Sequence, residues 1–431
     1  MKMLPRGSAT ILTALMLLLG LLPTSAWALG EKATEPYIRT RTVLWYDVKL
    51  STDKIDVNDT VTVTGKFHLF TDWPDAASKP ELTFLGQTAP GASMTRVESY
   101  VGDVPANQSL RGMEVGRDYA FKVVMKGRVP GRWHLQPELS VKGAGPIIGP
   151  GKWIEVAGNQ ADFKSPVTTL TGVQIPDLQT YNIGRVHAWH LFWVLIGVVW
   201  LLWWLRRPLV IPRWLAVQKG RDDLLLTPAD DKVAAALIVV ALVATVSGYW
   251  YIDQAFPYTV PLTGGSNRVE ALAEEPRPVK VTGTRAEYDV PGRALRLYAT
   301  ITNSGDRPVR IGEFTTAQLR FLNRELPVQM QSLDPEYPKD LIAPTGLKID
   351  RDAPIQPGES RQVYMEATDA AWETERLMSF LNDIDSRIGG LMFFWDDSGK
   401  RYLAEIGGPV LPVFTNLAQP QEAVRPTAGK I

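Results

Sequence analysis

The stretches VHAWHLFWVLIGVVWLLWWL (residues 186–205) and VAAALIVVALVATVSGYWYI (residues 233–252) decide the architecture of this chain. Neither stretch contains an acid, a lysine or an arginine. At about 1.5 Å of rise per residue, each would form a helix about 30 Å long, the thickness of a bilayer's hydrocarbon core. The segment between them, residues 206–232, carries six lysines and arginines, which predicts a cytoplasmic loop. We therefore predict two transmembrane helices that form a hairpin between two larger regions.

The first 28 residues have the pattern of a secretory signal peptide. A basic start is followed by an apolar run over residues 11–22 and by Ala26-Trp27-Ala28, a small-residue cleavage site. Cleavage after Ala28 would make Leu29 the mature N-terminus, and an uncleaved anchor is the alternative. The predicted signal peptide and the basic loop indicate the same membrane topology. Both large regions are expected in the periplasm, with the chain anchored in a bacterial inner or intracytoplasmic membrane.

Composition excludes several classes of function. Lysine plus arginine equals aspartate plus glutamate at 46 each, so no overall positive charge favours a nucleic-acid partner. The chain has no cysteine, which rules out disulfides and the thiolate that blue-copper centres require. Residues 29–180 and 253–431 are each long enough to bury a core of their own.

Both flanking regions have the pattern of β structure. In residues 60–70, Val61, Val63, Phe67 and Leu69 alternate with polar side chains, as expected of a half-buried strand. Further short strand-like runs are separated by turn signals, which is typical of a sandwich or barrel. The residues leave a sandwich and a barrel open for each region.

The second region contains two predicted hairpins and one predicted helix. The hairpins pair residues 295–302 with 309–314, and residues 391–395 with 401–406. Between them, an apolar stripe predicts a helix that begins after Thr368 and ends at Gly389. The tail after Pro412 is expected to be frayed or bound to a partner.

His134 is the most interesting of four histidines. Strand alternation predicts Trp133 and Leu135 on the buried face, with His134 and Gln136 on the other. A His-x-His pair at this spacing suits copper or zinc, but the second position here is glutamine. We favour a structural, hydrogen-bonded role for His134 over metal binding.

The other three histidines are expected to have ordinary roles. His68 follows Lys66 on a polar strand face, which favours a surface or partner role over metal binding. His187 and His190 are spaced to share one helix face at the start of the first apolar run, where interfacial anchoring is the simpler interpretation. No phosphate-binding loop, nucleophile elbow or zinc-protease motif is present in the sequence.

Several runs resemble the B subunits of the particulate methane and ammonia monooxygenases, and the likeness extends in order over nearly the whole chain. These runs are RTVLWYD (41–47), GKFHLFTDWP (65–74), GAGPIIGPGKWI (143–154), residues 163–172 and WHLFW (189–193). The resemblance implies a mainly β chain with two cupredoxin-like β-sandwich domains in the periplasm, joined by the hairpin. It also implies a complex with subunits A and C, typically a trimer of three-subunit protomers, in contact with membrane lipid. The implied activity is copper-dependent oxidation of methane or ammonia with dioxygen and an external reductant.

The chain departs from the family's pattern at the copper positions. Members whose B subunit holds copper have a histidine at the start of the mature chain, where this chain has Leu29. Their His-x-His pair corresponds to His134 and Gln136. A further histidine of theirs corresponds to Leu44, while its partner is retained as His68. Each site has therefore lost ligands that the metal would need.

These losses predict a scaffold that holds the periplasmic side of the complex. We assign no catalytic residue and no complete metal site to this chain, and we expect copper to be bound by other subunits. The alternatives are a stand-alone membrane-anchored copper carrier or chaperone of the periplasm and an envelope structural protein built from paired sandwiches. Scarce histidine and missing thiols disfavour the carrier, because Cu(I) handling favours soft sulfur ligands.

Overall fold

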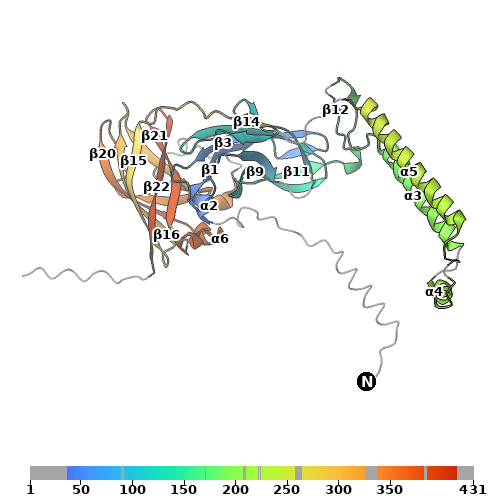
Figure 1. The fold of residues 1–431 in the computed structure, drawn as a ribbon. Helices are drawn as coiled ribbons and strands as arrows, with labels where there is room; N and C mark the ends of the chain where they lie inside the picture. Colours follow the sequence, from blue (N-terminus) through green and yellow to red (C-terminus); the bar gives the residue numbers. More distant parts are fainter. Residues whose placement is uncertain are drawn as a thin grey trace, which may run out of the picture. The chain divides into compact units, whose positions relative to one another are not determined.

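The computed structural model describes residues 36–414 except 89–91, 170, 207–209, 222, 224, 258–264, 327–336 and 383–385. The chain divides into two compact units, one formed by residues 1–162 with 265–431 and the other by residues 163–264. The first unit contains the large β regions on both sides of the hairpin, and the second contains the two long helices of the hairpin (Figure 1). The predicted signal peptide, Leu29 and the tail from residue 415 lie outside the described residues.

The N-terminal part of the first unit is a sandwich of two sheets. The five-stranded sheet has the order β1-β3-β8-β5-β6 and the seven-stranded sheet the order β14-β7-β4-β9-β11-β2, with β10 paired to β9. The strands of the first sheet are β1 (Val43–Leu50), β3 (Thr60–Leu69), β8 (Asp118–Gly127), β5 (Met94–Val101) and β6 (Val104–Pro105). Those of the second are β14 (Ser266–Arg268), β7 (Ser109–Arg111), β4 (Thr83–Thr88), β9 (Gly131–Val141), β11 (Lys152–Ala157), β2 (Lys54–Asp56) and β10 (Gly145–Ile148).

The core of the sandwich follows from strand alternation. Val61, Val63, Phe67 and Leu69 on β3 are all fully buried, which confirms the predicted apolar face of residues 60–70. Side chains from the second sheet share the same apolar cluster, so the two sheets face each other. The strand β14 follows the hairpin in sequence, yet it pairs in parallel with β7.

The remaining strands of the first unit close into an eight-stranded barrel. Their order is β15-β16-β20-β19-β18-β17-β21-β22. The bounds are β15 (Val279–Asp289), β16 (Ala294–Asn303), β17 (Val309–Thr316), β18 (Leu319–Asn323), β19 (Ile342–Ile349), β20 (Ser360–Thr368), β21 (Arg387–Asp396) and β22 (Arg401–Val413). The barrel, one of the two folds that strand spacing left open, is confirmed for this region, and the sandwich that the resemblance implied was wrong. The long strand β22 pairs with both β21 and β15 and leaves no free edge.

One of the two predicted hairpins in this region is correct. Residues 391–395 and 401–406 pair directly in β21 and β22, with Trp395 opposite Arg401. Residues 295–302 and 309–314 form strands as predicted, but they do not pair with each other. Instead β16 lies between β15 and β20, while β17 lies between β18 and β21. Each of the two strands pairs with one neighbour in sequence and with one distant strand, which leaves neither an edge for the other.

The predicted helix between Thr368 and Gly389 was wrong. Among the described residues of this stretch, which exclude 383–385, the structure has α6 (Ala371–Thr374), the 3-10 segment η6 (Leu377–Asn382) and the start of β21. Almost every residue of β21 is buried, because the strand has the barrel core on one face and the sandwich on the other. The apolar stripe that suggested a helix lies mostly on η6, whose Leu377 is fully buried, while its last member, Ile388, already belongs to β21.

Short elements complete the first unit. They are the helix α2 (Pro36–Arg41) and the 3-10 turns η2 (Gln160–Asp162) and η5 (Lys339–Leu341). All but one of the α2 residues are buried, and α2 contacts both β21 and η6.

The second unit contains the predicted hairpin. The helices α3 (Ile183–Leu205) and α5 (Pro228–Ala255) include both apolar runs and are long and apolar enough to cross a membrane. A helix that was not predicted, α4 (Val210–Gln218), lies between them, and β12 (Val167–Thr168) pairs with β13 (Gln174–Ile175) before α3. Thr227 and Asp230 form a capping box at the start of α5.

Candidate functional site

Leu44 and His68, the two positions that the resemblance associates with one copper site, lie directly opposite each other in the structure. Strand β1 pairs antiparallel with β3, and the register places Leu44 against His68. Both side chains are fully buried. The geometry therefore brings together the two positions that the resemblance associated with one site, although only one of them carries a metal-binding side chain.

His68 bridges two carboxylates from different parts of the first unit. Its Nδ1 lies 3.0 Å from an oxygen of Asp118 on β8, and its Nε2 lies 3.0 Å from an oxygen of Glu405 on β22. The ring of Phe70 packs edge-on against the imidazole. The predicted surface role of His68 was wrong, because Glu405 from the barrel covers the strand face that alternation assigned to solvent.

Each carboxylate is held by further donors. Asp118 accepts hydrogen bonds from the Tyr46 hydroxyl and the Arg277 guanidinium. Glu405 accepts from the backbone N–H of Thr71 at 3.0 Å and from its hydroxyl at 2.9 Å. These hydrogen bonds hold the two carboxylates in place. The positive charge of Arg277 partly balances their negative charge.

This environment favours the charged form of His68. Burial by itself would lower the pKa of the imidazole, but the hydrogen bonds and negative charges of Asp118 and Glu405 raise it above its ordinary value. The pKa of each carboxyl is lowered, because the pairing with His68 outweighs the effect of burial. An imidazolium donates from both ring nitrogens and has no lone pair for a metal.

Leu44 belongs to an apolar cluster where the sandwich meets the barrel. It packs with Phe70 of the sandwich and with Leu391 and Phe393 of β21. Its neighbour Tyr46 lies 6.1 Å from Phe393, measured between ring centroids. Position 44 therefore carries no metal ligand but an apolar side chain that contacts both the sandwich and the barrel.

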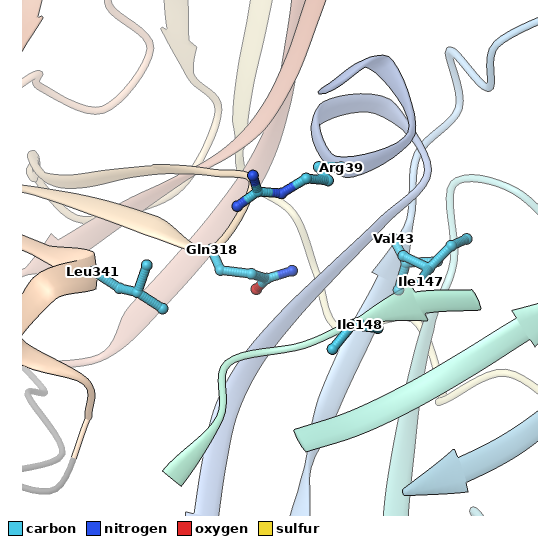
Figure 2. A pocket seen from close by; sticks show the side chains of 6 residues that line it. All are labelled: Arg39, Val43, Ile147, Ile148, Gln318 and Leu341. Atoms are coloured by element: carbon cyan, nitrogen blue, oxygen red, sulfur yellow. The ribbon is translucent and has the colours of Figure 1, made fainter. Parts of the chain in front are cut away.

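Ion pairs and one small cavity surround this cluster. Arg39 of α2 donates to the backbone carbonyl of Glu375 at 2.7 Å and to its carboxylate at 3.2 Å. Nearby, Arg39 and Gln318 line a cavity of about 10 Å³ together with apolar side chains (Figure 2). The other lining residues are Val43, Ile147, Ile148 and Leu341. This volume is enough for about one water-sized molecule.

His134 occupies a different site on the seven-stranded sheet. It lies opposite Trp153 of β11, and the two ring centroids are 4.9 Å apart. Burial lowers the pKa of His134, while a hydrogen bond to the Gly151 backbone partly opposes that effect. A Cβ atom at Gly151 would lie only 2.3 Å from His134 and 2.5 Å from Gln136, which explains the glycine. Leu135 is buried as predicted, but Gln136 is buried as well.

His187 and His190 lie on the first turns of α3 and are exposed within their unit. The Nδ1 of His190 lies 2.8 Å from the carbonyl of Val186, one turn earlier. Across the described parts of the chain, no three or more His, Cys, Asp or Glu side chains are grouped so that they could hold a metal. His68 and its carboxylates do not form such a group, because each carboxylate faces a different ring nitrogen.

Sequence reasoning found His68 but missed Asp118, Glu405 and Arg277. Asp118 lies opposite His68 in the β3–β8 register, so a correct strand pairing would have placed them together. Glu405 is separated from His68 by 337 positions and is brought near only by the packing of barrel against sandwich. No local sequence signal marks that contact.

Comparisons with known proteins agree with one family. The family described as monooxygenase B-subunit protein matches residues 30–414. A protein of Methylococcus capsulatus (Bath) named particulate methane monooxygenase alpha subunit is 44% identical over 391 residues, which cover 90% of this chain and 93% of that protein. The solved cupredoxin domain of amoB from Nitrosocaldus yellowstonii is 17% identical, with a TM-score of 0.23, over 30% of this chain and 97% of that domain.

A substitution at His68 tests the buried imidazolium. Because the folded-state pKa of His68 is raised, its contribution to stability is complete below the unfolded value of about 6.5 and is lost as pH rises through the folded value. We expect His68→Gln to lower the midpoint of thermal unfolding of the full chain most at mildly acidic pH. The difference in unfolding midpoint between the variant and the unsubstituted protein should become smaller as pH rises.

His134→Gln is the matched control. The pKa of His134 is lowered, so the unsubstituted protein gains stability from this residue as pH rises, and the pH trend of the control should be opposite. A difference for His68→Gln that is constant with pH would contradict the charged bridge.

Proposed function

Because this chain belongs to the family of monooxygenase B subunits, we propose that it is the periplasmic scaffold of a membrane-bound, copper-dependent monooxygenase. In this proposal the complex oxidises methane to methanol or ammonia to hydroxylamine with dioxygen. The observation that carries the scaffold role is the pairing of Leu44 with His68. One side chain is apolar, and both nitrogens of the other are hydrogen-bonded to carboxylates.

The chemistry of the family copper positions does not fit a bound copper in this chain. Copper takes neutral imidazole through a ring lone pair, and His68 uses both nitrogens in its bridge. His134 is a single imidazole, and Gln136 beside it offers an amide oxygen, a poor ligand for copper. We therefore propose that other subunits bind the copper and react with oxygen. This chain then takes no direct part in catalysis.

The proposed topology follows from charge and from the family's membrane location. Two helices of membrane length support a chain anchored in the membrane. The basic loop 206–232 is assigned to the cytoplasm and the first unit to the periplasm. The proposed partners are subunits A and C, in a trimer of three-subunit protomers, since the related protein is itself named as a subunit.

The stand-alone copper carrier remains the alternative function. A carrier must bind copper reversibly through accessible ligands, and Cu(I) favours sulfur. The chain has no cysteine, and His68 is inaccessible to solvent. These features favour the scaffold over the carrier.

Replacing His134 with alanine tests whether this chain holds functional copper. We expect the assembled complex with His134→Ala to keep its copper content per protomer and its turnover, because the ring only packs on Trp153 and hydrogen-bonds locally. Metal analysis and substrate oxidation in native membranes measure both. Loss of copper together with turnover, with all subunits still assembled, would contradict the scaffold.

Restoring the missing histidine gives a second test. We expect Leu44→His to create no tight copper site, because His68 stays engaged by Asp118 and Glu405. The substitution should instead destabilise the first unit by about 2–5 kcal/mol, as expected when buried apolar contacts are removed. Leu44→Met, which conserves volume, should cost less than about 1.5 kcal/mol. Unfolding of the full chain and copper titration report the two effects, and stoichiometric copper binding by Leu44→His would contradict the account.

A further inference from the structure

The helix α4 presents an apolar face that the described residues of its own unit leave exposed. Ile211, Trp214 and Leu215 follow the i, i+3, i+4 spacing of one helix face, and they are 70%, 59% and 44% exposed. The opposite face is turned inward, since Arg213 and Ala216 are half-buried. Figure 1 shows α4 at the end of the α3–α5 hairpin.

Specific contacts hold α4 in that orientation. The Arg213 guanidinium donates to the carbonyl of Leu225 at 3.3 Å and lies 5.3 Å from the ring centroid of Trp204 on α3. Gly220, with a φ of +64°, ends the helix in the left-handed conformation typical of a C-terminal cap. The apolar face therefore belongs to a defined helix.

A second set of contacts joins the two long helices at this end. The indole N–H of Trp203 on α3 donates to the carboxylate of Asp230 on α5 at 2.8 Å, and Asp230 also caps α5 through Thr227. The Arg206 guanidinium lies 5.1 Å from the Trp203 ring. Buried carboxylate, indole and guanidinium groups are typical of the boundary between hydrocarbon and water. The loop carrying α4 therefore emerges at the surface of the membrane that α3 and α5 cross.

The charge of this loop complements an anionic surface. Residues 206–227 contain five basic and two acidic side chains. Arg206, Lys219 and Arg221 are exposed beside the apolar face of α4. An amphipathic helix with basic flanks is typical of an interfacial segment, which buries its apolar face at the boundary between headgroups and acyl chains.

We propose that α4 lies in the headgroup layer and that Arg206, Lys219 and Arg221 bind the phosphates of anionic phospholipids. A protein that bound this chain through α4 alone is a poorer occupant of this face. At about 1.5 Å per residue, a nine-residue helix is about 14 Å long, too short to supply the roughly 800 Å² that each side of a stable protein interface buries. The proposal depends on α3 and α5 crossing the membrane and is independent of the oxygen chemistry.

Spin labels test the depth of α4. The chain has no cysteine, so Leu215→Cys in the full chain provides one labelling site, and Asp223→Cys provides an exposed control on the same loop. Both proteins are reconstituted into vesicles of phosphatidylcholine and phosphatidylglycerol in equal parts. We expect the label at Leu215 to collide mainly with membrane-soluble oxygen and the label at Asp223 mainly with a water-soluble nickel chelate. Equal exposure of the two labels to nickel would overturn the proposal, and so would shielding of the Leu215 label from both reagents.

Spin-labelled lipids test the headgroup preference. The motionally restricted fraction should be larger for phosphatidylglycerol than for phosphatidylcholine around the unsubstituted chain. The double variant Lys219→Gln/Arg221→Gln should show a smaller preference for phosphatidylglycerol. Each lost positive charge should reduce the preference about fivefold, since a basic residue near the membrane surface contributes about 1 kcal/mol. The matched pair Arg324→Gln and Lys348→Gln, both exposed on the barrel, should leave it unchanged. An undiminished preference in the Lys219 and Arg221 double variant would overturn the proposal.

Discussion

The buried imidazole of His68 is a polar contact that joins the sandwich to the barrel. Each of its nitrogens lies 3.0 Å from a carboxylate, Asp118 in the sandwich and Glu405 in the barrel. A charge without solvent contact is stable only where opposite charges and hydrogen bonds replace water. Both carboxylates meet that need while belonging to different parts of the fold. The packing of the two parts and the charge on His68 are therefore coupled.

This arrangement explains how a position associated with copper in the family can serve a structural role. Leucine at position 44 extends the apolar contact with β21, and His68 turns to the carboxylates on either side. The proposed function and the observed packing thus have the same physical origin, the burial of strands β1 and β3 against the barrel.

Features with a local signal could be predicted from the sequence, and features set by distant contacts could not. The helices α3 and α5 follow from the length of their apolar runs, and the β21–β22 hairpin follows from its polar turn. The pairing of β16 depends on barrel closure, which no short stretch encodes. At the site, residue types identified His68, but Glu405 reaches it only through the folded barrel.

Nitrogen-15 NMR of the histidine side chains tests the central claim most directly, because the full chain has only four histidines. With the labelled chain in membranes at neutral pH, the account predicts that both ring nitrogens of His68 carry protons. It also predicts that their resonances do not change when copper is added. A His68 ring with one unprotonated nitrogen whose signal shifts or broadens with copper would contradict the account and restore this position as a metal ligand.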